Sequence, residues 1–161
     1  MKTKITCLII FMSLCLFLSI SSNCKKSTAP GSGVVYFLVS EINPFHGDSF
    51  ILPLTDPEDI EFAEKIVADI NSTTSRIVSA RIARGSGGGS YLNKDLSSGS
   101  SRVWSWHVVE FFDFVDVTIE IQDSRPTYVE ENLDRWMQQN NGMIGFWSYT
   151  VTRKVDISEL Q

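Results

Sequence analysis

The sequence predicts an α+β fold, in which a mainly antiparallel sheet of about five to six strands has two helices packed on it. Two observations lead to this fold class. Most apolar segments alternate with a period of two residues or are rich in β-branched residues, as strands are. Two segments, which begin near Pro57 and Pro126, repeat their apolar residues at helical spacing instead. The resulting order, β-β-α-β-β-β-α-β, is typical of helices packed against an antiparallel sheet.

The first half of the domain predicts two strands, a helix and a third strand. Residues 34–42 and 49–54 are short apolar runs separated by a turn that contains Gly and Pro. Asp56 is a favourable N-cap and Pro57 suits the first helical position, so we expect the helix to begin there. One face of this helix is apolar and consists of Ile60, Ala63, Ile66, Val67 and Ile70. The β-branched segment 76–84 is the third strand.

Two further strands are expected at 103–109 and 113–122, because their side chains alternate between apolar and polar. The expected inward residues are Trp104, Trp106 and Val108 in the first strand and Val115, Val117, Ile119 and Ile121 in the second. Asp123 or Ser124 then caps a second helix, which has Pro126 in its first turn. The apolar face of this helix consists of Val129, Leu133, Trp136 and Met137.

Two segments that contain glycine separate these elements. Asn140-Asn141-Gly142 ends the second helix, and residues 145–155 follow as the last strand. Residues 85–102 are rich in Gly and Ser and contain few apolar residues, so we expect a disordered insertion in the domain. A phosphate cradle is disfavoured, because a strand and not a helix follows this loop.

The N-terminal segment has the layout of a secretory signal peptide, which we place at residues 1–23. Lys2 and Lys4 precede an apolar run that is too short for a comfortable membrane span, although an uncleaved anchor is the alternative. Residues 24–33 are expected to be a flexible tether. Residues 34–161 then form a single α+β domain.

Cys24 is the expected site of lipidation. It resembles the cysteine of a bacterial lipoprotein signal, which is acylated, commonly with palmitate, and becomes the first mature residue. Ser21 and Asn23 depart from the common form of that signal, and ordinary cleavage after Ser21 would give a secreted protein instead. Because Cys7 and Cys15 leave with the signal, Cys24 would otherwise be an unpaired thiol in an exported protein. We therefore expect a cell-envelope protein that is lipid-anchored to a bacterial membrane.

The charge of the chain disfavours nucleic acid as a partner. There are 14 basic and 19 acidic residues, which give a formal net charge of −5. The loss of two lysines with the signal would make the mature protein more acidic. An acidic surface repels phosphate backbones, and the sequence has no run of Lys and Arg that would form a groove for them.

Six motifs occur in the same order as in a known domain family. They are Asp48-Ser49-Phe50-Ile51 through Leu54-Thr55-Asp56-Pro57, Trp104-Ser105-Trp106-His107, Phe111-Phe112, Ile119-Glu120-Ile121-Gln122-Asp123, Tyr128-Val129-Glu130-Glu131-Asn132-Leu133-Asp134 and Trp147-Ser148. Over residues 34–155 the chain resembles the N-terminal domain of the slime-mould calmodulin-binding protein, which also occurs as short stand-alone bacterial proteins. The resemblance implies no enzymatic activity.

Two points limit what this resemblance implies. Members of the family tend to have cysteines at two positions that Gln122 and Phe146 occupy here, so disulfide or thiol chemistry between them is excluded. Calmodulin is not expected as a partner, because its targets are basic amphipathic helices. Both predicted helices of this chain are rich in acidic residues.

The polar and aromatic residues of the second half form the candidate functional surface: Ser105, His107, Glu120, Asp123, Tyr128, Glu130 and Trp147. Ser105 and His107, with an acidic residue, suggest a hydrolase of the Ser-His-Asp type. The two residues lie two positions apart on one strand, about 7 Å along it, which is long for a nucleophile and its base. A structural role for His107 is therefore favoured, and no catalytic residue is assigned.

No metal ion or other cofactor is expected. His46 lies in a turn, and no loop has the alternating Asp and Asn residues of a calcium site. The leading hypothesis is a non-catalytic, lipid-tethered binding or interaction module for a protein or a small molecule. The alternatives are a secreted inhibitor-like or ligand-capturing protein that uses the 85–102 loop, and a hydrolase that uses Ser105 and His107.

Overall fold

The computed structural model describes residues 33–43, 46–70, 76–97, 99, 101–116 and 124–161. Its elements are β1 (Val35–Glu41), β2 (Ser49–Leu54), α1 (Pro57–Ala68), β3 (Ile77–Arg84), β4 (Trp106–Val115), α2 (Pro126–Glu131), α3 (Leu133–Asn140), β5 (Met143–Ile144), β6 (Tyr149–Val155) and the 3-10 helix η1 (Ile157–Leu160). The prediction of an α+β fold is confirmed. The expected signal peptide, the tether and Cys24 lie outside the described residues. None of the helices in the described part of the chain is long and apolar enough to cross a membrane.

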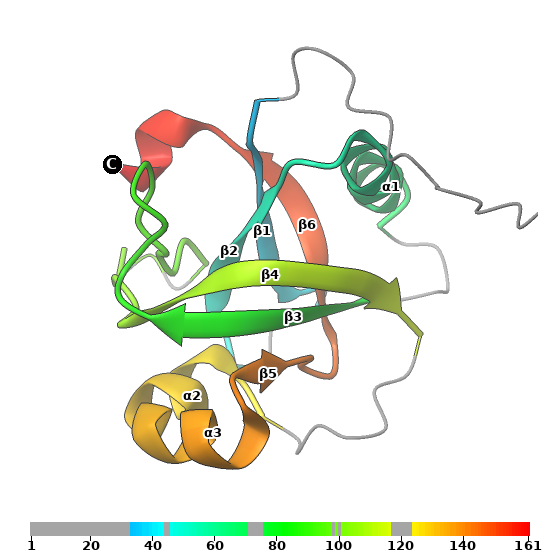
Figure 1. Cartoon of the computed structure of the whole chain (residues 1–161). Coiled ribbons are helices and arrows are strands. Elements are labelled where there is room, and N and C mark those ends of the chain that lie inside the picture. The colour runs from blue at the N-terminus through cyan, green and yellow to red at the C-terminus, as the bar shows by residue number, and fades with distance from the viewer. Residues whose placement is uncertain (1–32, 44–45, 71–75, 98, 100, 117–123) are drawn as a thin grey trace, which may run out of the picture.

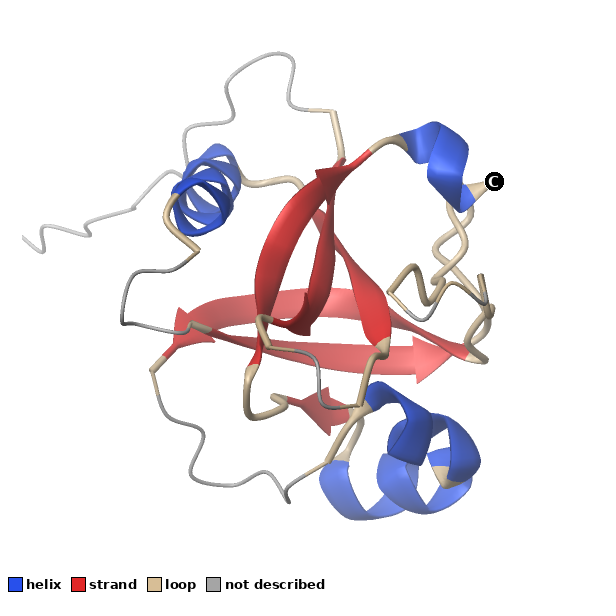
Figure 2. Cartoon of the chain, turned by 180° about the vertical axis from the view of Figure 1, so that it is seen from behind, coloured by secondary structure: helices blue, strands red, loops and turns tan. Residues whose placement is uncertain are grey.

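The strands form two antiparallel sheets of three strands, with the orders β2-β1-β6 and β4-β3-β5. The expectation of one larger sheet is therefore corrected to two smaller ones. Figure 1 shows the two sheets facing each other with their strands crossing steeply. The helices do not share one face, because α1 lies beside β6 whereas α2 and α3 lie beside β5 at the opposite end (Figures 1 and 2).

Aromatic side chains fill the core between the sheets. Trp104 and Trp106 are fully buried, as the alternation predicts, and their rings stack with centroids 5.9 Å apart. Phe50 of β2 packs against Trp106 at 5.7 Å and against Phe146 at 5.9 Å. Buried aromatic rings of this size remove large apolar areas from water, so this cluster stabilises the packing of the two sheets.

Strand β4 departs from the predicted pattern of alternation. The sequence predicts separate strands at 103–109 and 113–122, whereas one strand runs from Trp106 to Val115. Its pairing with β3 shifts between Ser79 and Ala80 and again between Arg81 and Ile82. Each shift adds one residue to β4, as a β-bulge does. The residues of β4 that join the core or pack against it are therefore Trp106, Val108, Phe111 and Phe114, and the expected inward residue Val115 is not among them. The other predicted inward residues, from 117 onward, lie outside the described residues.

The first helix begins as predicted, and the second has Pro126 in its first turn as predicted but is not capped by Ser124. Asp56 accepts a hydrogen bond from the backbone N–H of Glu58 at 3.0 Å, and Pro57 is the first helical residue. The second helical segment divides at Asn132 into α2 and α3, and Arg125, at the N-cap of α2, has no side-chain capping bond. The predicted alternative cap, Asp123, lies outside the described residues.

Residues 85–102 were expected to be a disordered insertion, and this prediction is wrong for the described part of the loop. Asn93 is fully buried, and Asp95 is nearly so. The Asn93 side chain accepts from the backbone N–H of Ile51 and donates to the carbonyl of Trp106, both at 2.8 Å. The loop therefore joins the outer edge of β2 to the outer edge of β4. The prediction of disorder was based on the low apolar content of the loop, and it did not take into account these hydrogen bonds of a buried polar side chain.

Candidate functional site

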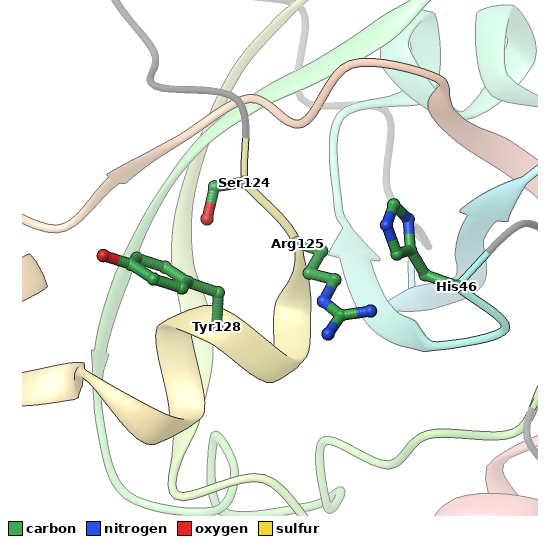
Figure 3. A pocket seen from close by; sticks show the side chains of 4 residues that line it. All are labelled: His46, Ser124, Arg125 and Tyr128. Carbon is green, nitrogen blue, oxygen red and sulfur yellow. The ribbon is translucent and has the colours of Figure 1, made fainter.

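A pocket of about 170 Å³ lies between the start of α2 and the loop that leads into β2. His46, Ser124, Arg125 and Tyr128 line it, and we call it the Arg125 pocket. Figure 3 shows Ser124, Arg125 and Tyr128 on the chain that enters and forms the first turn of α2, with His46 on the facing loop. The residues come from opposite halves of the sequence, so only the tertiary structure brings them together.

A buried glutamate fixes the His46 side of the pocket. Glu41 ends β1, and its side chain is only 7% exposed. One carboxylate oxygen accepts from Nδ1 of His46 at 3.0 Å, and the other accepts from the backbone N–H of His46 at 2.9 Å. Because a carboxylate only accepts at neutral pH, Nδ1 carries the proton of this bond. The loop is thus held to the end of β1 by two hydrogen bonds to one charged group.

A buried aspartate fixes the α2 side. Asp48, which is 5% exposed, accepts from the backbone N–H of Thr127 at 2.9 Å and from its hydroxyl at 2.7 Å. Its other oxygen accepts from the hydroxyl of Tyr149 on β6. Hydrogen bonds to a charged acceptor are about twice as strong as neutral ones. Asp48 therefore holds α2 and β6 against the chain before β2, and it satisfies a helix N–H that the local sequence does not cap.

Two buried tyrosines have a pKa above the ordinary value for this side chain. Burial raises the pKa of Tyr149 strongly, and the hydrogen bond to Asp48 and the negative charge of that carboxylate raise it further. Burial also raises the pKa of Tyr91, whose ring packs against Tyr36 with the centroids 5.1 Å apart. Both hydroxyl groups therefore keep their protons in the folded protein at pH values where an unfolded tyrosine begins to ionise.

This difference predicts a loss of stability at alkaline pH. Above about pH 10 the unfolded chain releases protons from Tyr149 and Tyr91 while the folded chain retains them, so the free energy of unfolding falls as pH rises. The expected slope is up to about 1.4 kcal/mol per pH unit for each tyrosine. Urea unfolding at pH 8, 10 and 11 (roughly spanning the tyrosine range) measures it, and Tyr149→Phe and Tyr91→Phe should each reduce the slope. Equal slopes in all three proteins would contradict the assignment.

Ser105 and His107 form hydrogen bonds to different parts of the molecule. The backbone N–H and the hydroxyl of Ser105 both donate to one carboxylate oxygen of Glu130 at 2.9 Å. Nδ1 of His107 lies 2.8 Å from the carbonyl oxygen of Gly85 and donates to it. Two residues of the predicted functional surface, Ser105 and Glu130, therefore lie in direct contact. His107 is instead bound to the glycine-rich loop.

The other predicted surface residues are spread over the second half of the chain. Tyr128 lies on α2 and lines the Arg125 pocket, with 38% of its surface exposed. Trp147 is 43% exposed, in the turn between β5 and β6. Glu120 and Asp123 lie outside the described residues. Among the residues that the structure describes, no group of three or more His, Cys, Asp or Glu side chains is placed to hold a metal ion.

Sequence reasoning missed most of the pocket. His46 was assigned to a turn, Ser124 only to a possible cap, and Arg125 to no role. One signal was available: Glu41 and Asp48 are charged residues at the ends of apolar strands that the pattern predicts to be buried. A charge at such a position needs partners, because burying it alone is costly.

One comparison with known proteins matches a family model. The model is described as the BP-74 N-terminal domain, and it matches residues 33–158. This match confirms the family resemblance that the motifs between residues 34 and 155 indicate. No curated protein and no solved structure matches the chain.

Proposed function

Because the chain belongs to the BP-74 N-terminal domain family, we propose that it is a non-catalytic binding domain whose ligand occupies the Arg125 pocket. The observation that carries this proposal is the pocket itself. Its walls are fixed by the buried carboxylates of Glu41 and Asp48, while Ser124, Arg125 and Tyr128 line the space. Preformed pockets with a few fixed polar groups are typical of binding sites.

The hydrogen bonds of the candidate catalytic residues also favour binding over catalysis. A serine nucleophile needs its hydroxyl within about 3 Å of a base that takes the proton. The Ser105 hydroxyl instead donates to Glu130, and His107 is bound to the carbonyl of Gly85. We therefore assign both residues a structural role: Ser105 binds α2 through Glu130, and His107 binds the 85–102 loop through Gly85.

A ligand screen tests the binding proposal. We expect small organic acids, amino acids, sugars or short peptides to include compounds that raise the melting temperature of the wild-type protein. Ser124→Phe should abolish these shifts, because the added ring fills the pocket. Gln139→Phe, which adds the same ring at an exposed position of α3, is the control and should retain them. Hits that shift the Ser124→Phe protein as strongly as wild type would refute the pocket as the binding site.

We further propose that the domain is exported and tethered to a bacterial membrane by an acyl chain on Cys24. The support comes from the sequence of residues 1–33, with its basic start, its apolar run and Cys24 directly before a Ser- and Gly-containing tether. Such a tether would leave the Arg125 pocket free to meet ligands outside the membrane.

Metabolic labelling with a palmitate analogue tests the tether. We expect the wild-type protein to be labelled in a bacterial host and Cys24→Ser to lose the label completely. Cys15→Ser is the matched control, since it removes a thiol from the expected signal peptide and should leave labelling unchanged. A Cys24→Ser protein that still incorporates the analogue would rule out this site of acylation.

A further inference from the structure

We propose that the Arg125 pocket recognises a carboxylate group, carried by a small organic acid or by the end of a peptide. Arg125 is the residue that would hold this group, and Tyr128 would contact the part of the ligand next to it. The inference rests on the proposed binding function and adds to it the chemical class of the ligand.

The observation behind this proposal is that the side chain of Arg125 has no partner among the residues that the structure describes. Its side chain is partly buried beside the pocket, and within the described part of the chain it has neither an ion pair nor a hydrogen bond. Other arginines of the domain do have carboxylate partners, namely Asp116 for Arg76, Glu110 for Arg81, Asp134 for Arg84 and Glu159 for Arg153. A guanidinium group is always charged, and its planar fork of N–H donors matches the two oxygens of a carboxylate.

The neighbouring carboxylates do not take the place of the ligand. Both oxygens of Glu41 accept from His46, and both oxygens of Asp48 accept from Thr127 and Tyr149. None of these donors is Arg125, so its guanidinium remains available to a ligand. Their negative charges oppose an incoming anion. For a doubly charged phosphate both this repulsion and the attraction to Arg125 are about twice as large as for a carboxylate, and the two carboxylates outnumber the one guanidinium. The charge balance therefore favours a singly charged ligand.

The size of the pocket restricts the ligand further. A volume of about 170 Å³ is below the range of roughly 300–1,000 Å³ that is usual for drug-sized ligands. The pocket can thus enclose one small group and not a whole oligosaccharide or nucleotide. The ring of Tyr128, which is 38% exposed, offers an apolar surface beside the polar end. A carboxylate attached to a short flat or aliphatic segment fits both features.

A titration with matched probes tests the ligand class. The full chain, labelled with ¹⁵N and kept in a non-ionic detergent, is titrated with hippurate and with hippuramide, which differ only in the carboxylate. We expect hippurate to shift the backbone amide signals of Arg125 and Tyr128 and to bind about tenfold more tightly than hippuramide. Arg125→Gln should weaken hippurate binding by about tenfold, and Arg125→Lys should weaken it less, because it retains the charge but not the fork.

Arg135→Gln is the control variant. Arg135 is exposed on α3, and it too has no ion pair in the described residues, so its loss removes the same charge outside the pocket. Hippurate binding to this variant should equal that of wild type. If phenyl phosphate binds more tightly than hippurate, the site is a phosphate site and the inference is overturned.

The remaining outcomes separate this inference from the proposed function. Equal binding of hippurate and hippuramide, with signal shifts confined to the pocket, would overturn the carboxylate inference and leave the binding function in place. Unchanged hippurate binding in Arg125→Gln would have the same meaning. If neither probe shifts the pocket signals, the inference also fails, and the binding function fails with it only if the ligand screen yields no compound that depends on Ser124.

Discussion

Replacement of Asp48 by Asn is expected to lower the free energy of unfolding by about 3 kcal/mol, because it weakens three bonds at once. The carboxylate accepts from the backbone and hydroxyl of Thr127 and from the hydroxyl of Tyr149, and it is almost fully buried. An amide in its place has one oxygen only, so its NH₂ group must face a donor. Urea unfolding of the purified variants at neutral pH measures this effect.

The matched control for Asp48 is Asp113→Asn. Asp113 is exposed on β4, where its side chain accepts from the backbone N–H of the next residue at 2.7 Å. Surface changes of this kind usually alter stability by less than about 0.5 kcal/mol. A double-mutant cycle with Tyr149→Phe should give a coupling energy of about 1–2 kcal/mol between Asp48 and Tyr149. If Asp48→Asn and Asp113→Asn had the same free energy of unfolding, the hydrogen bonds of Asp48 would not be what holds α2 and β6 in place beside the pocket.

Asn93→Ala is the second variant with a large expected effect, about 3–4 kcal/mol of lost stability. Its side chain is fully buried and bonds to the N–H of Ile51 and to the carbonyl of Trp106. Truncation leaves one buried donor and one buried acceptor without partners, and each such group destabilises the protein by about 1–3 kcal/mol. The loss of the side chain volume adds a small cavity. The same urea experiment gives the size of the effect.

Asn132→Ala is the control for Asn93. Asn132 also donates a side-chain hydrogen bond, at 3.0 Å, but to the carbonyl of Tyr128 in an exposed position where water can replace it. We expect a change below about 1 kcal/mol for this variant. Limited proteolysis gives an independent test, because Asn93→Ala should expose the 85–102 loop to cleavage much faster than Asn132→Ala does. Equal cleavage rates would mean that the loop does not depend on the Asn93 bridge.

Much of the fold could be predicted from local patterns. The start of α1 follows from Asp56 and Pro57, whose capping bond and ring geometry act within a few residues. The end of α3 follows from Asn141 and Gly142, which both adopt positive φ, at 50° and 71°. The burial of Trp104 and Trp106 follows from alternation. These features depend on neighbours in the chain, so the sequence pattern contains them.

The candidate site could be predicted only in part. Tyr128 was recognised as a surface residue, but its partners in the pocket come from residue 46 and from the segment just before α2. The inward positions of β4 were wrong beyond Val108, because two bulges set by pairing with β3 shift the pattern. Contacts with segments far along the chain decide both effects, and the charged residues Glu41 and Asp48 at the strand ends are the one signal that the sequence offers for the pocket.

The sequence by itself therefore determined the α+β class, the family, the helix boundaries at Pro57 and Gly142, and the hypothesis of a lipid tether at Cys24. Only the tertiary structure decided that the strands form two sheets, that the 85–102 loop bridges them, and that a pocket forms around Arg125. The physical reason is that buried polar groups must find partners wherever the chain brings them. Asp48 finds its partners 79 and 101 residues away, and no local pattern encodes such distances.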